Sequence, residues 1–466
     1  MAEMPDNVTD RTAGPWGWIS SLADAAFPSA PGAGLSRVLG ILGLSMLALS
    51  LASSRAGQNI AVAFMLLGLL PNARRAWADL WPDPVFRLIL LWVAYVVVRA
   101  VVAAVQMPEL AGAQIGSLGF YARLLYIPLV GWWLGRSPVS VKALGLLVLI
   151  GLLVGVGINL DWQHPIAFLQ LGPGHLGGRK GFGMNPEHTS LVSVLVLAGM
   201  IAYAREWIGP GGQPRGLWVL RALAWVVVTA LVFQVLIVSQ TRAAWLAGLI
   251  VGLSAAGVYA WRGLRAEPPR RRRTLAVLGI AVLGLGLVLT VNSSSVVKRM
   301  TQDAGTYREI VHGRFNQIQN MDVGARVYLW RWAIRKWRQR PVFGWGPGSR
   351  RSMISNSNLP KFIREHLGHV HNSYLEVAFA LGLVGVTLYL LVWGLLLRRL
   401  WHGMRSKQLP SPTGGVLLAA VALFALASGA EAYVVVEIGW TLTALLGGAM
   451  FAVRGARRDA PRATRV

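Results

Sequence analysis

Runs of about 20 predominantly apolar residues recur along nearly the whole of this 466-residue chain. An α-helix of that length spans the hydrocarbon core of a bilayer, which is roughly 30 Å thick. Hydrophobic residues make up 55% of the chain and charged residues only 14%, a balance that excludes an ordinary soluble globular protein. The sequence therefore predicts an all-α polytopic membrane protein.

The apolar runs divide into about twelve candidate transmembrane helices. The second run is the shortest, and the polar residues 239–242 supply the break between the seventh and eighth runs. The predicted helices cover residues 36–53, 58–71, 85–105, 115–135, 139–160, 187–205, 217–239, 242–261, 274–292, 371–397, 414–431 and 434–453.

The loops between these helices alternate in charge, because every second loop is basic and the short loops between them are nearly free of lysine and arginine. By the positive-inside rule the basic loops face the cytoplasm, and so do both termini. The predicted organisation is a cytoplasmic tail in residues 1–35, helices 1–9 in 36–292, a large outward loop in 293–370, helices 10–12 in 371–453 and a basic cytoplasmic tail in 454–466.

The outward loop at 293–370 departs from this charge pattern. It contains fourteen lysines and arginines against four acidic residues. The positive-inside rule weakens for loops longer than about 60 residues, so a loop of this charge can still be translocated. Topology gives no reason for an outward loop to be so basic, and we expect it to meet an anionic partner.

Part of this loop is predicted to be helical. Trp330, Ala333, Ile334 and Trp337 recur at helical spacing, and Pro341 ends the segment. Such an amphipathic helix is expected to lie at the membrane interface, with its tryptophans among the acyl chains.

The segments that follow this helix are predicted to be irregular. Residues 343–350 read as a turn whose glycines let backbone N–H groups approach a ligand, although no phosphate-binding loop motif is present. Residues 354–369 read as an irregular polar lid.

Several polar residues lie at predicted outward helix ends. Arg242, at the start of the eighth helix, either extends to the lipid head groups or has a function. Arg179, Lys180 and Asn185 belong to a glycine-rich loop that either grips an anion or is simply solvated. His188 is expected to cap or pack against its helix. Three further carboxylates either bind a sugar hydroxyl or are solvated helix ends: Glu187, Glu431 and Glu437.

A histidine cluster precedes the tenth predicted helix. The spacing of His366, His369 and His371 superficially resembles a metal site, but no matching carboxylate accompanies it, and the absence of cysteine excludes thiolate ligands. No metal is therefore predicted. His371 is placed at the helix start, where it either caps the helix or acts as a general base, and Asn372 either orients its ring or caps the helix.

Three motifs in fixed order resemble the O-antigen ligase and polymerase superfamily. They are R-x3-L from Arg242 to Leu246, the GARxxLWRWA…P-FGWGPG segment of the long loop, and H-N-x9-G-x2-G from His371 to Gly385. The resemblance covers about residues 170–400, and an O-antigen ligase is the preferred match within the superfamily. Gly382 and Gly385 themselves are expected only to allow close helix packing.

The resemblance implies a GT-C-type glycosyltransferase of the bacterial inner membrane with its active site on the periplasmic face. The donor would be O-antigen on undecaprenyl diphosphate and the acceptor a hydroxyl of the lipid A–core oligosaccharide, with inversion and without metal or cofactor. Membrane lipids are expected partners and nucleic acid is not. An O-antigen polymerase and a protein O-oligosaccharyltransferase share the motifs. A flippase or transporter for lipid-linked oligosaccharides is the non-enzymatic alternative.

The resemblance also assigns roles to single residues. His371 matches the family histidine proposed as the base, and Arg242 matches the R-x3-L arginine. A diphosphate leaving group needs fixed positive charge, and without a metal-binding acidic pair arginines must supply it. After Arg242, the predicted phosphate-binding residues are Arg326, Arg314, Arg179 and Lys180, and the supporting residues are Asn372, Tyr374 and Asn185.

Overall fold

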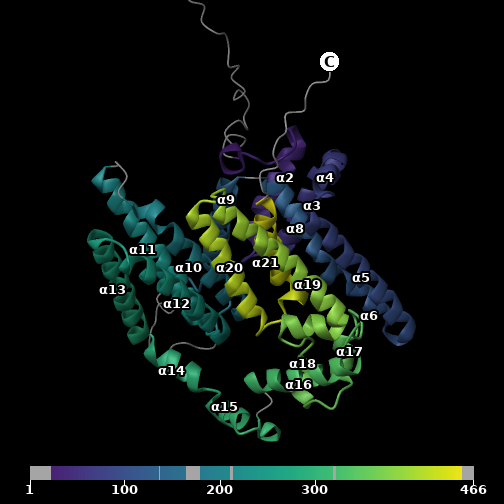
Figure 1. Ribbon diagram of the computed structural model, residues 1–466. Coiled ribbons are helices and arrows are strands. Elements are labelled where there is room, and N and C mark those ends of the chain that lie inside the picture. Colours follow the sequence, from purple (N-terminus) through teal and green to yellow (C-terminus); the bar gives the residue numbers. More distant parts are fainter. Residues whose placement is uncertain (1–22, 136, 164–178, 210–213, 319–321, 454–466) are drawn as a thin grey trace, which may run out of the picture.

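A computed structural model describes residues 23–135, 137–163, 179–209, 214–318 and 322–453, and within these ranges the regular structure is entirely helical (Figure 1). The two predicted tails at 1–22 and 454–466, and residues 164–178 of the glycine-rich loop, lie outside the described residues. Eight helices are long and apolar enough to cross a membrane, which confirms an all-α polytopic membrane protein. They are Arg55–Leu80 (α3, η1 and α4), Pro84–Gln106 (α5), Pro138–Ile158 (α9), Pro186–Ile208 (α10), Arg215–Val238 (α11), Arg242–Leu264 (α12), Ser373–Arg405 (α19) and Ser411–Ser428 (α20).

The remaining predicted spans also fall on helices, but these helices are shorter or interrupted. The helix α2 (Gly34–Ser50) has 17 residues and α21 (Glu437–Ala452) has 16. The helix α13 covers Pro268–Val291 and contains the arginine run at 270–273 ahead of its apolar part. The count of twelve transmembrane helices therefore stays a prediction.

The fourth predicted span, residues 115–135, is not one continuous helix. It forms the short segments α6 (Ala111–Gly116), α7 (Leu118–Ala122), η3 (Arg123–Leu125) and α8 (Tyr126–Leu134). Glycines at 116 and 119 weaken the helix, and Pro128 lacks a backbone N–H to continue it. The last segment, α8, is almost wholly buried and packs on α21, where the glycines at 131, 447 and 448 allow close approach.

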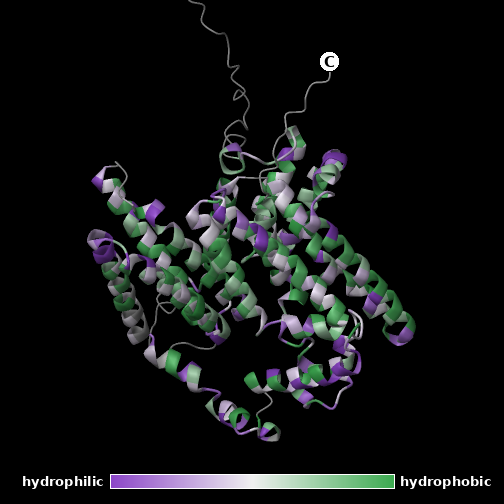
Figure 2. Ribbon diagram, in the orientation of Figure 1, coloured by the Kyte–Doolittle hydropathy of each residue, from purple (hydrophilic) through white to green (hydrophobic). Residues whose placement is uncertain are grey.

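The bundle core is formed by α2 against α3, α10 against α11 and α20, and α19 against α5 and α20. Apolar residues dominate these long helices, whereas polar residues gather at helix ends and in the short helices at one end of the bundle (Figure 2). These short helices are α14 (Ser293–Thr301), α15 (Ala304–Val311), α16 (Val323–Gln339), α17 (Arg350–Ser355) and α18 (Lys361–His366), with η5 at Phe315–Gln317. We call this end of the bundle the loop end (Figure 1).

The predicted helix in the long loop exists as α16, but its apolar face has a different partner. Ala333 is buried against Leu329, Ile354, Ile363 and Phe379, in a small core of the protein itself. Burying an apolar side chain against other protein groups removes it from lipid and water alike, so Ala333 packs on the chain itself. Trp330, Ile334 and Trp337 are only partly buried, and their expected place at the membrane interface stays a prediction.

The predicted irregular lid at 354–369 is also corrected. It contains α18, and Ile354 and Ile363 are fully buried in the same small core. A segment anchored by two buried isoleucines is a packed element, and the many polar residues between them concealed this in the sequence.

The long helix α19 is interrupted at Gly382, whose φ is +64°. A β-carbon on Gly382 would come within 2.2 Å of the Val342 carbonyl oxygen, so the glycine is required where another backbone segment approaches. The turn at 341–346 fills the break, because Trp345 and Gly346 donate backbone hydrogen bonds to the carbonyls of Phe379 and Ala380. The glycines of this turn therefore approach α19 rather than a ligand, and Gly382 does more than allow helix packing.

Candidate active site

His371 lies two residues before α19 rather than at its start. The helix begins at Ser373, and Asn372 is its N-cap, with its side-chain oxygen accepting hydrogen bonds from the backbone N–H groups of Tyr374 and Leu375. His371 has a φ of +52°, a left-handed conformation that is rare for a residue other than glycine. Such strain persists only where the surrounding structure imposes it, and it is concentrated at functional sites.

The peptide before His371 is held on both of its edges. Arg350 donates from Nε to the Gly368 carbonyl at 2.6 Å and forms an ion pair with Glu376, which is fully buried. The other oxygen of Glu376 accepts the Val370 N–H at 3.0 Å, and the indole of Trp330 donates to the Val370 carbonyl at 3.0 Å. These contacts explain how the strained backbone at His371 is maintained.

A buried carboxylate orients the ring of His371. Nδ1 of His371 lies 2.8 Å from Oε2 of Glu431, whose side chain is only 5% exposed between α20 and η6 (Tyr433–Val435). The sequence prediction that no carboxylate accompanies the histidines is wrong, because Glu431 comes from the other side of the fold. A carboxylate accepts the Nδ1 proton, so Nε2 carries the lone pair. Among the described residues, Nε2 has no hydrogen-bond partner.

The second oxygen of Glu431 contacts His369. Nε2 of His369 lies 2.9 Å from Oε1, and the two imidazole rings are 4.1 Å apart between centroids. Two imidazoles and a carboxylate are a donor set that Zn²⁺ uses, and these three side chains are close enough to hold an ion. The same atoms are joined by hydrogen bonds here, and Oε1 also accepts the Ala432 N–H at 2.8 Å. The absence of metal from the reaction stays a prediction.

Burial acts on the pKa values of Glu431 and His371 in opposite directions. Burial on its own would raise the pKa of Glu431, but hydrogen bonds from His369, His371 and Glu187 hold that pKa well below its usual range. Burial lowers the pKa of His371, and this effect outweighs the hydrogen bond to Glu431, which raises it. Glu431 is thus a carboxylate and His371 a neutral imidazole at neutral pH, which is the pairing that a general base requires.

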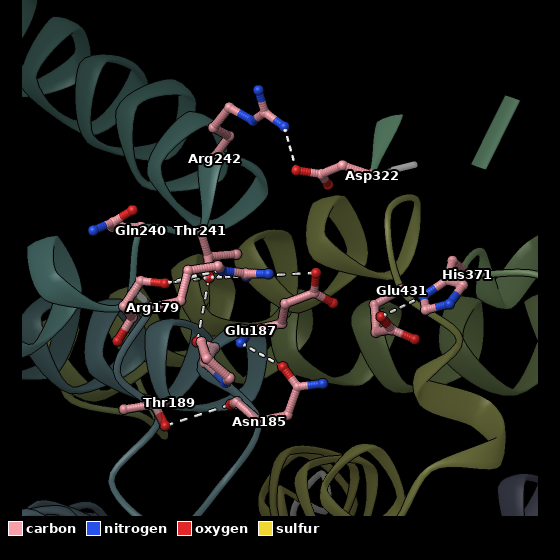
Figure 3. Close-up of polar contacts among 12 residues, drawn as sticks. Arg179, Asn185, Glu187, Thr189, Gln240, Thr241, Arg242, Asp322, His371 and Glu431 are labelled. Atoms are coloured by element: carbon pink, nitrogen blue, oxygen red, sulfur yellow. Dashed lines mark hydrogen bonds and ion pairs between the residues drawn. The ribbon is translucent and has the colours of Figure 1, made fainter. Parts of the chain in front are cut away.

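Two arginines reach the same carboxyl group from different elements. Arg326, on α16, and Arg179, in the loop before α10, both contact Oε1 of Glu187 in the first turn of α10. The Arg179 contact, drawn in Figure 3, is 3.6 Å long, and Arg179 is also held by a 3.0 Å hydrogen bond to the Thr241 hydroxyl. Arg326 lies close enough to influence the charge of His371. The predicted phosphate-binding residues Arg326 and Arg179 therefore meet at Glu187, with Arg326 near the histidine.

A small pocket lies against Glu187, Arg326 and Glu431. Its free volume is about that of one water-sized sphere, and it is partly open to its surroundings. Its lining residues are Glu187, Thr241, Ala243, Ala244, Arg326, Ala427, Ala430, Glu431 and Tyr433.

Arg242 belongs to a separate ion-pair cluster. Its guanidinium contacts Asp303 and, at 3.1 Å, Asp322, and Arg299 also contacts Asp322 at 3.1 Å. In Figure 3 Arg242 points toward Asp322, whereas Arg179 points toward Glu187. Arg242 therefore joins the start of α12 to the loop-end segments, and the structure does not bring its charged group to the pocket.

The other predicted residues have mainly local contacts. Arg314 pairs with Glu309 at 2.9 Å and is half-exposed, and Lys180 is exposed with its backbone N–H bonded to the Val238 carbonyl. Asn185 caps α10 by accepting the Glu187 N–H. Tyr374 donates its hydroxyl hydrogen bond to the Ala425 carbonyl, which joins α19 to α20.

The sequence suggested Glu431 and Glu187 only as sugar-binding or solvated helix-end carboxylates, and not as partners of His371 and the arginines. A signal was present, since the chain has only 19 acidic residues, and Glu431 stands between apolar segments in GAEAYVVV. A carboxylate in such surroundings is costly to bury unless it is paired. His188, by contrast, packs against the Tyr433 ring, which confirms its expected packing role.

Comparison with known protein families identifies one match. Residues 227–390 match the family described as O-antigen ligase. The matched segment contains Arg242, Arg326 and His371, whereas Glu187 and Glu431 lie outside it. A separate comparison with curated proteins found no match to this chain.

Proposed function

We propose that this chain, a multi-pass membrane protein whose residues 227–390 match an O-antigen ligase family, is a glycosyltransferase that ligates O-antigen to lipid A–core oligosaccharide. The donor in this proposal is O-antigen on undecaprenyl diphosphate. The observation that supports it best is His371, which is oriented by Glu431 with Nε2 unoccupied and lies beside Arg326. A base next to fixed positive charge suits the displacement of a diphosphate.

The reaction needs one proton transfer and one displacement. Nε2 of His371 takes the proton of the acceptor hydroxyl, and the acceptor oxygen forms a bond to the anomeric carbon as the bond to the diphosphate oxygen breaks. Attack from the face opposite the leaving group inverts the configuration. The Glu431 carboxylate stabilises the imidazolium that forms and keeps its Nδ1–H in place, as the carboxylate of a catalytic triad does.

The leaving group, undecaprenyl diphosphate, carries the negative charge released by the displacement. Arg326 and Arg179 can each donate two parallel hydrogen bonds to phosphate oxygens, and a partly buried site strengthens these contacts. In this proposal the two arginines stabilise the negative charge of the leaving group, and no metal is needed to do so. Arg242 is further from this chemistry, and we propose that it mainly holds the loop end in register through Asp303 and Asp322.

The membrane placement follows from the charge pattern. We place the site on the periplasmic face of a bacterial inner membrane, with both termini in the cytoplasm, because the basic loops define the cytoplasmic side. In this proposal the helical bundle, with its site beside the short helices of the loop end, is of the GT-C type. Membrane lipids surround the long helices.

Replacing the gene with one that encodes His371→Ala tests the proposal in cells. We expect no glycan on lipid A–core, and long polymer retained on undecaprenyl diphosphate, at wild-type levels of the membrane protein. The matched control is His402→Ala, an exposed histidine in the last turn of α19, which should leave transfer unchanged.

The lipid-linked glycans distinguish the alternatives. Single repeat units left on the carrier would indicate a polymerase, and glycan missing from proteins but present on lipid A–core would indicate a protein O-oligosaccharyltransferase. Purified protein in detergent separates transfer from transport, since a transporter forms no new glycosidic bond when donor and acceptor are mixed. Normal glycan on lipid A–core in the His371→Ala cells would refute His371 as the base.

A further inference from the structure

We propose that the Glu187 carboxyl group occupies the arginine pair and must be displaced by the substrate, so that a diphosphate is accepted and a single phosphate is not. This inference rests on the proposed function and identifies a residue that determines its selectivity.

The position of Glu187 carries the argument. Its Oε1 contacts Arg326 and Arg179, which arrive from two different segments, and its side chain is only 12% exposed. Oxygen atoms on a negative group are what these guanidinium groups would bind in a phosphate, so the Glu187 carboxylate stands where such an oxygen would be. Substrate binding therefore requires an exchange of anions rather than the filling of a vacant site.

The groups around Glu187 favour this exchange. Glu431 lines the same pocket and is hydrogen-bonded to Glu187, so the two carboxyl groups share one proton. His369, His371, His188 and Tyr433 also face this pair. Moving the shared proton onto Glu187 weakens its hold on the arginines, which lowers the cost of moving it off them.

The small volume of this pocket supports the same conclusion. The space beside Glu187 and Arg326 holds about one water-sized sphere, which is too small for a phosphate group. An anion gains access only when Glu187 swings away. The apparent affinity of any anion is then reduced by the fraction of molecules in the open state.

The reduced affinity affects single phosphates more than diphosphates. A diphosphate can engage both arginines with oxygens from two phosphorus centres, whereas one orthophosphate offers fewer contacts across the pair. Only the diphosphate recovers what is lost when Glu187 leaves. The carboxylate thus protects the arginines from single phosphate groups, including those of lipid head groups.

Inhibition by inorganic salts tests the proposal with purified, full-length protein in lipid nanodiscs. Transfer by the wild-type protein should be inhibited by pyrophosphate at concentrations at least tenfold below those of orthophosphate. In Glu187→Gln, which keeps the size and hydrogen bonding but removes the charge, orthophosphate should inhibit at least tenfold more strongly, and the ratio between the two salts should fall.

Glu437→Gln is the matched control. Glu437 also lies in the first turn of a helix but pairs with the largely exposed Arg55, so this variant should keep the wild-type ratio. If Glu187→Gln does not fold, Glu187→Ala should change the ratio in the same direction. A ratio within twofold of wild type in a folded, uncharged variant overturns the proposal.

A binding measurement separates this inference from the proposed function. Pyrophosphate should raise the unfolding temperature of the wild-type protein, and orthophosphate should raise it only in Glu187→Gln, because a ligand stabilises the state that binds it. These shifts need no glycosyl transfer. If transfer is absent but the shifts follow this pattern, the proposed function fails and the role of Glu187 stands. If transfer occurs and orthophosphate stabilises both proteins equally, the role of Glu187 fails alone.

Discussion

Two polar clusters lie at the loop end, and they are built in opposite ways. The histidine cluster of His369, His371 and Glu431 has a single carboxylate and no arginine or lysine, and Nε2 of His371 is without a hydrogen-bond partner among the described residues. The Arg242 cluster, made of Arg242, Arg299, Asp303 and Asp322, has two cations and two anions in mutual contact. The first arrangement leaves a group available for proton transfer, whereas the second cancels its own charge.

This difference separates chemistry from architecture. The family motifs place Arg242 and His371 together as catalytic residues, but Arg242 joins α12 to the segments around α14 and α16. Because Asp303 and Asp322 already neutralise Arg242 and Arg299, these arginines attract an anionic substrate only weakly. Charge held by Glu187 alone, as for Arg326 and Arg179, is easier to transfer to a phosphate.

The largest expected effect comes from removing the carboxylate that orients the base. Glu431→Gln should lower kcat for glycan transfer by about a hundredfold or more, since general base catalysis is commonly worth that much. The amide can donate to Nδ1 and hold the wrong tautomer, with the lone pair turned away from the substrate. Steady-state transfer with purified protein measures this. Glu206→Gln, which alters an exposed ion pair with Lys142, is the control. An equal loss of kcat in this variant would contradict the catalytic role of the histidine cluster.

An intermediate effect is expected in the Arg242 cluster. Arg242→Ala leaves two partly buried carboxylates facing each other, and such a loss typically costs about 3 kcal/mol of unfolding free energy. Thermal unfolding and limited proteolysis between α14 and α16 should both report it. Asp303→Asn should lower stability and transfer in the same direction. Raised or unchanged transfer in folded Asp303→Asn would instead assign Arg242 to the substrate.

The smallest expected effect is a shift in pH dependence. Burial lowers the pKa of His371 below its usual value of 6.5, so the ring stays neutral as the pH falls through that value. The acidic limb of kcat against pH should therefore have its midpoint below 6.5, and activity is lost only when the imidazole gains a proton. A midpoint above 6.5 would mean that the hydrogen bond to Glu431 affects the pKa of His371 more than burial does. The histidine cluster would then contain an imidazolium–carboxylate ion pair.

Much of the fold could be predicted from periodicity and composition. The break between α11 and α12 at residues 239–241 and the helix α16 ahead of Pro341 are local features, set by polar residues and by proline. The interruption of residues 115–135 was missed, because high apolar content hid the glycines and the proline. The packing of α16 was also missed, since an amphipathic pattern says which face is buried but not against what.

The site was predicted less completely for a clear physical reason. His371, Arg326 and Arg179 could be predicted because they are charged or titratable residues at the helix ends and in the outward loops of a largely apolar chain. The partner of His371 lies 60 residues away at Glu431, and the pairing depends on how α19 and α20 meet. The positive φ of His371 and the contacts of Arg350 and Glu376 likewise come from tertiary structure alone.

The break in α19 at Gly382 has a consequence for how the protein is assembled. On either side of the break, Phe379 and Ala380 have carbonyls, and Leu383 and Val384 have N–H groups, that bond to the turn at 341–346. Arg99, from α5, in turn holds the carbonyls of Phe343 and Gly344. Backbone groups left unpaired in lipid cost several kcal/mol each. The backbone around the break in α19 therefore completes its hydrogen bonding only once the turn at 341–346 has docked on it, so formation of this helix and folding of the loop before it depend on each other.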